Sequence, residues 1–291
     1  MFLQIEHTTE YRYGEPVGLT PHLLRIVPRS SPGLHLIRSE LTISPEHSVS
    51  WNLDLEGNIV GLATFPELTD KLLIKSSLLI EQHLTNPFDF LLDSRSLHLP
   101  LVYDEREQPL LAPFLKRRDG ESAAHLDEFV RPFLNGSATK PNTLNVLTAI
   151  TRAIPAIFRY TQRHEAGVRL AWETMTYREG TCRDFAHLFI EAARSLGIAA
   201  RYVCGYLCSS PSDPGENHTH GWCELYLPGA GWRGFDPTNG ILAGPHHVVV
   251  ATSLVAGEIP PVEGTYCGKS GLCTSHEVSI TARELIPGEE K

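Results

Sequence analysis

The sequence predicts an α+β protein, with an N-terminal antiparallel β-sandwich followed by a second domain in which a buried helix packs on an antiparallel sheet. Three observations support this class. Short alternating apolar segments separated by turn residues occupy residues 1–85, apolar residues recur at helical spacing in 144–160 and 185–196, and alternating segments follow between 199 and 236. A chain of 291 residues is long enough for two domains.

Residues 1–85 contain about seven short runs that predict strands, separated by Gly, Pro and Asn residues. The clearest turn is segment 56–58, Glu-Gly-Asn, which predicts a hairpin between its flanking runs. Regularly spaced strands are typical of an antiparallel sandwich. The histidines here are scattered, so we interpret them as structural or exposed. The predicted strands are Phe2–Ile5, Thr8–Tyr13, Pro21–Pro28, Leu34–Ile43, Ser48–Leu55, Ile59–Phe65 and Leu72–Leu84.

Residues 86–142 form a connecting, partly helical segment. Apolar residues share one face of a predicted helix over 121–134, which Pro132 should kink or end. Asn142 or Thr143 is expected to cap the next helix, whose apolar periodicity runs to Tyr160 with an interruption at Pro155. We assign residues 143–291 to the second domain.

Segment 180–187, GTCRDFAH, lies at the head of a predicted buried helix. Thr181 and Asp184 have the spacing of a capping box, and Gly197 supplies the stop signal. Cys182 therefore belongs to the first turn of this helix. There the positive end of the helix favours thiolate over thiol, and free backbone N–H groups can bind an oxyanion. The sequence thus predicts Cys182 as a nucleophile.

His220 and Asp236, which follow Cys182 in the sequence, complete a predicted catalytic arrangement. A strand is predicted over 199–207, a polar loop over 209–217, and a hairpin with its turn at 228–231. His220 begins the first hairpin strand, and Asp236 ends the second, near the residue opposite His220. A carboxylate there can hold the imidazole by its far nitrogen. We expect Cys182, His220 and Asp236 to act as nucleophile, base and orienting carboxylate.

These motifs resemble the bacterial transglutaminase-like superfamily, and the resemblance covers most of the chain. Core motifs stand in order: GTCRDFAH at 180–187, LGIAARYV at 196–203, HGWCELYLPGAGW at 220–232 and GFDPTNG at 234–240. Residues 1–85 resemble the β-rich N-terminal domain that often precedes this core, with HTT at 7–9 and YRY at 11–13. The resemblance implies a papain-like core with Cys182, His220 and Asp236 as its triad. Two departures are Gly221, where relatives usually carry Ala, and Thr252-Ser253, near a usual Arg-Asp pair.

The resemblance implies a cysteine-dependent amide hydrolase, a cysteine protease or amidase that forms a thioester acyl-enzyme. Its partners would be peptide, protein or small amide substrates, with no metal or organic cofactor. The alternatives are transglutaminase activity, in which an amine resolves the thioester, and a non-catalytic binding module on the same fold. Hydrolysis is favoured because water reacts by default in an open cleft. The acidic residues Asp213 and Glu216 of the polar loop are the one feature that could attract an amine.

Several singled-out residues have a second interpretation. His218 is an alternative base to His220, and Asp184 is expected to cap the helix rather than act as an acid. Trp222 and Trp232 are expected to be core aromatics that keep the site dry. A zinc site from His218, His220 and Cys223 with Cys204 or Cys208 is a weaker hypothesis, because this ligand spacing is unusual for zinc.

Composition excludes other classes. A net charge of −9 and a pI near 5.9 argue against nucleic-acid or anionic-membrane binding. No apolar run is long enough for a membrane span, and the first residues lack a signal-peptide pattern, so we expect a cytoplasmic protein. Six cysteines are too few for a disulfide framework in a chain of this length, and we expect most to be free thiols.

Overall fold

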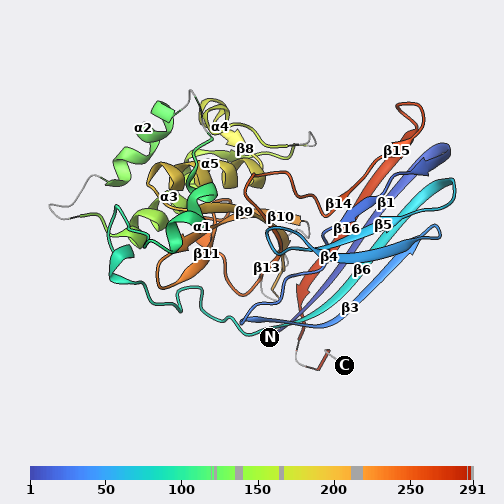
Figure 1. Ribbon diagram of the computed structural model, residues 1–291, viewed down its shortest axis with the longest axis horizontal. Coiled ribbons are helices and arrows are strands. Elements are labelled where there is room, and N and C mark those ends of the chain that lie inside the picture. Colours follow the sequence, from blue (N-terminus) through green and yellow to red (C-terminus); the bar gives the residue numbers. More distant parts are fainter. Residues whose placement is uncertain are drawn as a thin grey trace.

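The computed structural model describes residues 1–118, 120, 123–134, 140–163, 167–210, 219–286 and 288–289. Long antiparallel strands form one side of the molecule, and helices gathered around a smaller sheet form the other (Figure 1). The predicted α+β class, with a β-sandwich and a helix packed on an antiparallel sheet, is confirmed. Among the described residues, no helix is long and apolar enough to cross a membrane.

The sandwich consists of two antiparallel sheets. A cluster of buried apolar residues fills the space between them: Tyr13, Val17, Leu19, Leu24, Ile26, Ile43, Ala63, Leu72 and Ile74. The first sheet contains β15 (Tyr266–Cys267), β1 (Phe2–Leu19), β6 (Thr69–Gln82) and β3 (Leu34–Ser44), with β16 (Cys273–Glu284) also paired to β1. The second contains β14 (Val262–Glu263), β2 (His22–Leu24), β5 (Ile59–Thr64) and β4 (Ser48–Leu53).

Two predictions in this region need correction. The runs Phe2–Ile5 and Thr8–Tyr13 were expected as separate strands, but they belong to the single strand β1. The register shifts between Arg12 and Val17, so this irregularity accommodates the turn residues Gly14 and Pro16 without ending the strand. Residues 262–284 were assigned to the second domain, but β14, β15 and β16 pair with strands of the sandwich. They satisfy an edge of β1 and of β2 that would otherwise be left unpaired.

The connecting segment carries a 3₁₀ turn, η1 (Ser94–Ser96), and two helices, α1 (Glu107–Leu115) and α2 (Ala123–Leu134). Pro132 lies inside α2, and Pro155 lies inside the next helix, α3 (Thr143–Ile157). Each proline stands two residues before its helix ends, where only the last turn is affected. The predicted cap is confirmed, because the side chain of Asn142 accepts a hydrogen bond from the N–H of Asn145 at 3.0 Å.

The second domain is built around the helix α5 (Cys182–Ser195), whose residues are buried from Asp184 to Arg194. This helix packs on β9 (Ala200–Leu207) and β10 (Thr219–Leu227), the central strands of a five-stranded sheet. The remaining strands are β11 (Gly231–Asp236), β12 (Ile241–Leu242) and β13 (His247–Ser253), in the order β12-β11-β10-β9-β13. The elements that precede α5 are β7 (Arg159–Tyr160), α4 (Ala171–Tyr177) and β8 (Glu179–Gly180).

Another apolar cluster joins the two domains. It combines residues of the sandwich (Leu3, Ile5, Leu34, Leu78, Ile80, Ile280, Ala282) with residues of β9, β13 and the segment after β9 (Tyr206, Cys208, Val248, Val250). His7 lies beside this cluster, and its Nδ1 is 2.7 Å from the hydroxyl of Tyr206. Burial lowers the pKa of His7 to about 4, so its role is structural, as predicted.

The hairpin turn of the sandwich also reaches the second domain. The side-chain amide of Asn58 donates to the carbonyl of Thr252 and accepts from its N–H, both at 2.8 Å. The N–H of Leu254 donates to Glu56 at 2.8 Å. The end of β13 and the segment after it are therefore held by the sandwich.

Candidate active site

Cys182 is the first residue of α5, and the cap before it has the predicted form. The N–H of Thr181 donates to Oδ2 of Asp184 at 2.9 Å, and the N–H of Asp184 is 3.4 Å from the Thr181 hydroxyl. This reciprocal pairing begins the helix at Cys182. The thiol therefore lies at the positive end of the helix, beside backbone N–H groups that the helix itself does not use.

Asp184 caps the helix and also anchors the segment before it. Its Oδ1 accepts from the N–H of Arg169 at 2.7 Å and from the guanidinium of Arg163 at 2.9 Å. Burial raises the pKa of Asp184, but hydrogen bonds from Thr181, Arg169 and Arg163 outweigh burial and lower it. A carboxylate held in its charged form suits a cap and not a proton donor, as the sequence predicts.

His220 and Asp236 lie on neighbouring strands and are both almost fully buried. Nε2 of His220 is 2.8 Å from Oδ2 of Asp236. Because a carboxylate can only accept, the imidazole N–H is the donor. The register differs slightly from the prediction: Cys223 pairs with Phe235, so Asp236 comes opposite Trp222 and reaches His220 diagonally.

Several other groups hold the carboxylate of Asp236 in place. Its Oδ1 accepts from the N–H groups of Thr238 (2.9 Å) and Asn239 (3.2 Å), and its Oδ2 accepts from the Asn239 amide (2.7 Å). Burial raises the pKa of Asp236, but the hydrogen bonds and charge of His220, together with His247, bring it well below its usual range. Asp236 is therefore a fixed negative charge beside His220.

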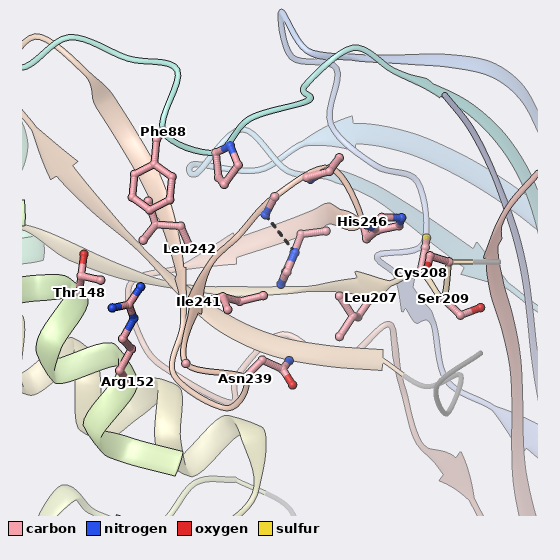
Figure 2. Close-up of a pocket in the computed structure, with 16 residues that line it drawn as sticks. Phe88, Thr148, Arg152, Leu207, Cys208, Ser209, Asn239, Ile241, Leu242 and His246 are labelled. Carbon is pink, nitrogen blue, oxygen red and sulfur yellow. Dashed lines mark hydrogen bonds between the residues drawn. The ribbon is translucent and has the colours of Figure 1, made fainter. Parts of the chain in front are cut away.

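A second histidine, which sequence reasoning missed, shares this carboxylate. Nε2 of His247, at the start of β13, is 3.1 Å from Oδ2 of Asp236. The N–H of Gly244 donates to Nδ1 of His247 at 3.1 Å, as the dashed line in Figure 2 shows. Nδ1 is therefore an acceptor, and the proton of the neutral ring is on Nε2, where it points to Asp236. Burial is the main reason why the pKa of His247 is lowered.

Cys182 lies on the other side of the His220 ring. Since Nε2 of His220 bonds to Asp236, the hydrogen bond between His220 and Cys182 uses Nδ1, and the N–H of Gly221 also donates to the sulfur. Burial raises the pKa of Cys182, but hydrogen bonding and charge from His220 outweigh burial and lower it. Burial lowers the pKa of His220, but Asp236 and Cys182 raise it to about 10. These directions favour a thiolate–imidazolium pair.

A cavity of about 580 Å³ opens directly beside Cys182. One side comes from the catalytic core, with Cys182, Tyr202 and Gly221. The opposite side comes from the loop 257–261 and from Val278 and Ile280 of β16. The sandwich therefore supplies one wall of the space in which a substrate would meet the thiol.

A second cavity, of about 740 Å³, is lined by residues of α3, of the β12 hairpin and of the segment before β13 (Figure 2). Thr148 and Arg152 of α3 border it, together with Phe88 and His246. Two of its lining residues, Asn239 and His247, also hydrogen-bond to Asp236. Cys182 does not line it, so this cavity is not where the sulfur would react.

The residues of the predicted zinc site do not assemble among the described ones. Cys223 is buried and donates to the carbonyl of Phe235, and burial raises its pKa well above the usual value. His218 and the loop residues Asp213 and Glu216 lie outside the described residues. Two other groups bring possible ligand atoms within 4.8 Å of one another: His220, Asp236 and His247, and on the sandwich His35, Glu81 and His83. In the first group, the two imidazoles already bond to Asp236.

Two regions of the chain match known families. Residues 3–81 match the bacterial transglutaminase-like N-terminal region, and residues 133–237 match the transglutaminase-like superfamily. The uncharacterized protein Rv2569c of Mycobacterium tuberculosis is 29% identical over 280 residues, covering 90% of this chain and 86% of that protein. The uncharacterized protein ML0607 of Mycobacterium leprae is 23% identical over 289 residues, covering 96% of this chain and 98% of that protein.

A solved structure shares the whole architecture. The crystal structure of a candidate cysteine protease from Cytophaga hutchinsonii superposes with a TM-score of 0.71 at 21% sequence identity, covering 97% of this chain and 90% of that one. Similarity at this level establishes the fold, including a papain-like core. With both family regions in the expected order, the chain belongs to the transglutaminase-like superfamily, with the bacterial N-terminal region before its core.

Proposed function

We propose that this chain is a cysteine-dependent amide hydrolase that acts through a thioester on Cys182. The observation that carries the proposal is geometric: Cys182 and His220 line the same cavity, and Nε2 of His220 is 2.8 Å from Oδ2 of Asp236. The pKa directions agree with it, because the pKa of Cys182 is lowered and that of His220 is raised to about 10. A thiolate and an imidazolium in contact are the resting form of an activated cysteine nucleophile. Asp236 keeps Nε2 of His220 occupied, so the proton on Nδ1 faces the sulfur.

The reaction follows from this arrangement. The thiolate of Cys182 attacks the amide carbon, a C–S bond forms, and the carbonyl electron pair moves onto the oxygen. His220 gives its proton to the amide nitrogen, the C–N bond breaks, and the amine leaves a thioester behind. Neutral His220 then takes a proton from water as the water oxygen bonds to the acyl carbon. Cleavage of the C–S bond releases the acid and restores the ion pair.

The lining of the cavity favours water over a lysine amine as the second nucleophile. Among the described residues that line it, none is acidic, Arg183 is positively charged, and the charge of Arg163 is paired with Asp184. The charge of Arg183 opposes the approach of an ammonium group. Water at about 55 M needs no binding site of its own. Hydrolysis is therefore the proposed outcome, and transfer to an amine is the alternative that the test below separates.

The test compares products in one mixture. Casein peptides are incubated with the protein in ¹⁸O-labelled water with millimolar monodansylcadaverine, and products are analysed by mass spectrometry. We expect new carboxylates that carry one ¹⁸O atom, either at cleaved peptide bonds or at glutamine side chains. Cys182→Ala should lose this product, whereas Cys273→Ala, which removes an exposed thiol on β16, should keep it.

Two outcomes would contradict the proposal. If a dansyl conjugate that depends on Cys182 is the main product, the protein is an acyltransferase. A separate probe, p-nitrophenyl acetate, reports the nucleophile without the natural substrate, because acetylation of the sulfur releases p-nitrophenolate. If Cys182→Ala releases p-nitrophenolate as fast as the unaltered protein, Cys182 is not the nucleophile.

A further inference from the structure

We propose that the hydroxyl of Tyr202 is a hydrogen-bond donor to the oxyanion of the reacting substrate, beside the backbone N–H of Cys182. This inference rests on the proposed function and assigns the donor that the sequence motifs leave unnamed. An acyl-transfer site normally supplies two donors to this oxygen. The backbone N–H at the head of α5 provides one of them.

The Tyr202 side chain is directed from β9 into the cavity beside Cys182. Tyr202 pairs with Cys223 of β10, and its ring belongs to the apolar cluster that packs around α5. It is only 3% exposed, yet it lines the cavity together with Cys182 and Gly221. In the part of the chain that the structure describes, no group hydrogen-bonds to its hydroxyl. A buried tyrosine usually finds such a partner, so a hydroxyl that faces a reactive cavity without one is available to a substrate.

Gly221 fixes where this hydroxyl lies relative to the sulfur. A Cβ atom at position 221 would stand 2.4 Å from the Tyr202 hydroxyl oxygen, so only glycine leaves the hydroxyl its present place. The N–H of the same residue donates to the sulfur of Cys182. The hydroxyl therefore contacts the residue that contacts the nucleophile.

The chemistry suits a donor that keeps its proton. Burial raises the pKa of Tyr202 well above its usual value, so the group remains a neutral phenol at all working pH values. When the thiolate attacks, the carbonyl electron pair moves to oxygen, and the phenol O–H shares its hydrogen with that oxygen without transferring it. His220 still protonates the leaving nitrogen. When the C–N bond breaks, the electron pair returns to form the thioester carbonyl.

The experiment compares two reactions of the same sulfur. Acetylation of Cys182 by p-nitrophenyl acetate passes through an oxyanion, whereas alkylation by iodoacetamide is a direct displacement that forms none. In Tyr202→Phe we expect the acetylation rate to fall about 100-fold, the magnitude typical of losing one oxyanion donor. The alkylation rate should stay within about twofold, because the thiolate and His220 are unchanged.

The matched control is Tyr206→Phe, four residues further along β9. The hydroxyl of Tyr206 bonds to His7 in the domain junction and does not line the cavity. This variant should keep both rates even where it lowers the thermal midpoint. A coupled test uses Gly221→Ala, which should displace the Tyr202 hydroxyl and lower acetylation. The double variant Tyr202→Phe/Gly221→Ala should then be no slower than the slower single variant.

The outcomes separate this inference from the proposed function. Acetylation within about twofold of the unaltered protein in Tyr202→Phe, with Cys182→Ala inactive, would overturn the role of Tyr202 and leave the nucleophile in place. Parallel loss of acetylation and alkylation would mean that Tyr202 acts on the thiolate and not on the oxyanion, which also overturns the inference. Circular dichroism of each variant verifies that it is folded.

Discussion

Two histidines bind the same carboxylate oxygen of Asp236, yet their pKa values are shifted from the ordinary histidine value in opposite directions. Nε2 of His220 and of His247 are 2.8 and 3.1 Å from Oδ2, and both rings are buried. The pKa of His220 is raised to about 10 in spite of burial, whereas that of His247 is lowered, mainly by burial. Asp236 raises the pKa of both rings, but Cys182 raises that of His220 further, whereas the charge of His220 lowers that of His247. The Nδ1 atom of His247 accepts instead from the N–H of Gly244.

This comparison shows that a buried carboxylate does not by itself decide whether a histidine is charged. A donor such as the Gly244 N–H requires a lone pair on Nδ1, so His247 stays neutral and can only support Asp236. A thiolate next to Nδ1 stabilises a proton there, and together with Asp236 this favours the charged form of His220. We expect the first residue to act in catalysis and the second to act through Asp236. Substitutions at the three positions test this order.

The largest effect is expected at the charged histidine. His220→Ala should lower kcat/KM by about 10⁵-fold or more, because it removes both the proton donor and the partner of the thiolate. The thermal midpoint should change by only a few degrees, since little packed volume is lost. Activity is measured as acetylation by p-nitrophenyl acetate and as casein cleavage. Activity that survives this substitution would mean that another base serves Cys182.

A smaller loss is expected at the shared carboxylate. Asp236→Asn should lower kcat/KM by about 10⁴-fold, because it removes the charge that orients His220 and keeps it protonated. The pH profile should also change. In the unaltered protein, we expect activity to fall at low pH as the thiolate is protonated, and at high pH as His220, whose pKa is raised to about 10, loses its proton.

Without Asp236, the pKa of His220 should fall toward or below its ordinary value, because burial still opposes the charge. The alkaline limb of the profile should therefore move down toward neutral pH in Asp236→Asn. Rates measured from pH 5 to 11 are enough to locate both limbs. An alkaline limb that does not move would show that Asp236 is not what keeps His220 charged.

The smallest effect is expected at the neutral histidine. His247→Ala should lower kcat/KM by about tenfold, because Asp236 keeps its other hydrogen bonds from Thr238 and Asn239. His247→Gln offers an amide N–H to Asp236 and should recover most of the activity. The alkaline limb should remain near that of the unaltered protein in both. A loss as large as that of Asp236→Asn would place His247 among the essential residues.

Local signals explain why the head of α5 could be predicted. Thr181, Asp184 and Gly197 encode the start and end of a helix within a few residues, so the position of Cys182 follows from short-range capping chemistry. The pairing of His220 with Asp236 could also be predicted, because a single hairpin links the two residues. The contact of His247 with Asp236 could not, because it depends on β13 pairing with β9, which is a choice between strands distant in sequence.

The same distinction applies to the sandwich. The hairpin of β4 and β5 follows from the turn residues at 56–58, which lie between the two strands. The pairing of β16 with β1 joins residues such as Leu3 and Glu284, and no turn signal connects them. Alternation of apolar and polar residues can indicate a strand, but it does not identify the strand with which it pairs. The sequence therefore could not place the wall of the active-site cavity that β16 provides.

The position of β16 has a consequence for synthesis on the ribosome. Cys182 and the rest of the core are made before residues 273–284, yet Val278 and Ile280 of that last strand line the cavity beside the thiol. The strand can only be added to β1, which is made long before it. A nascent chain thus carries Cys182 beside an unfinished cavity until β16 has emerged. Closure of the sandwich is the step that completes this cavity.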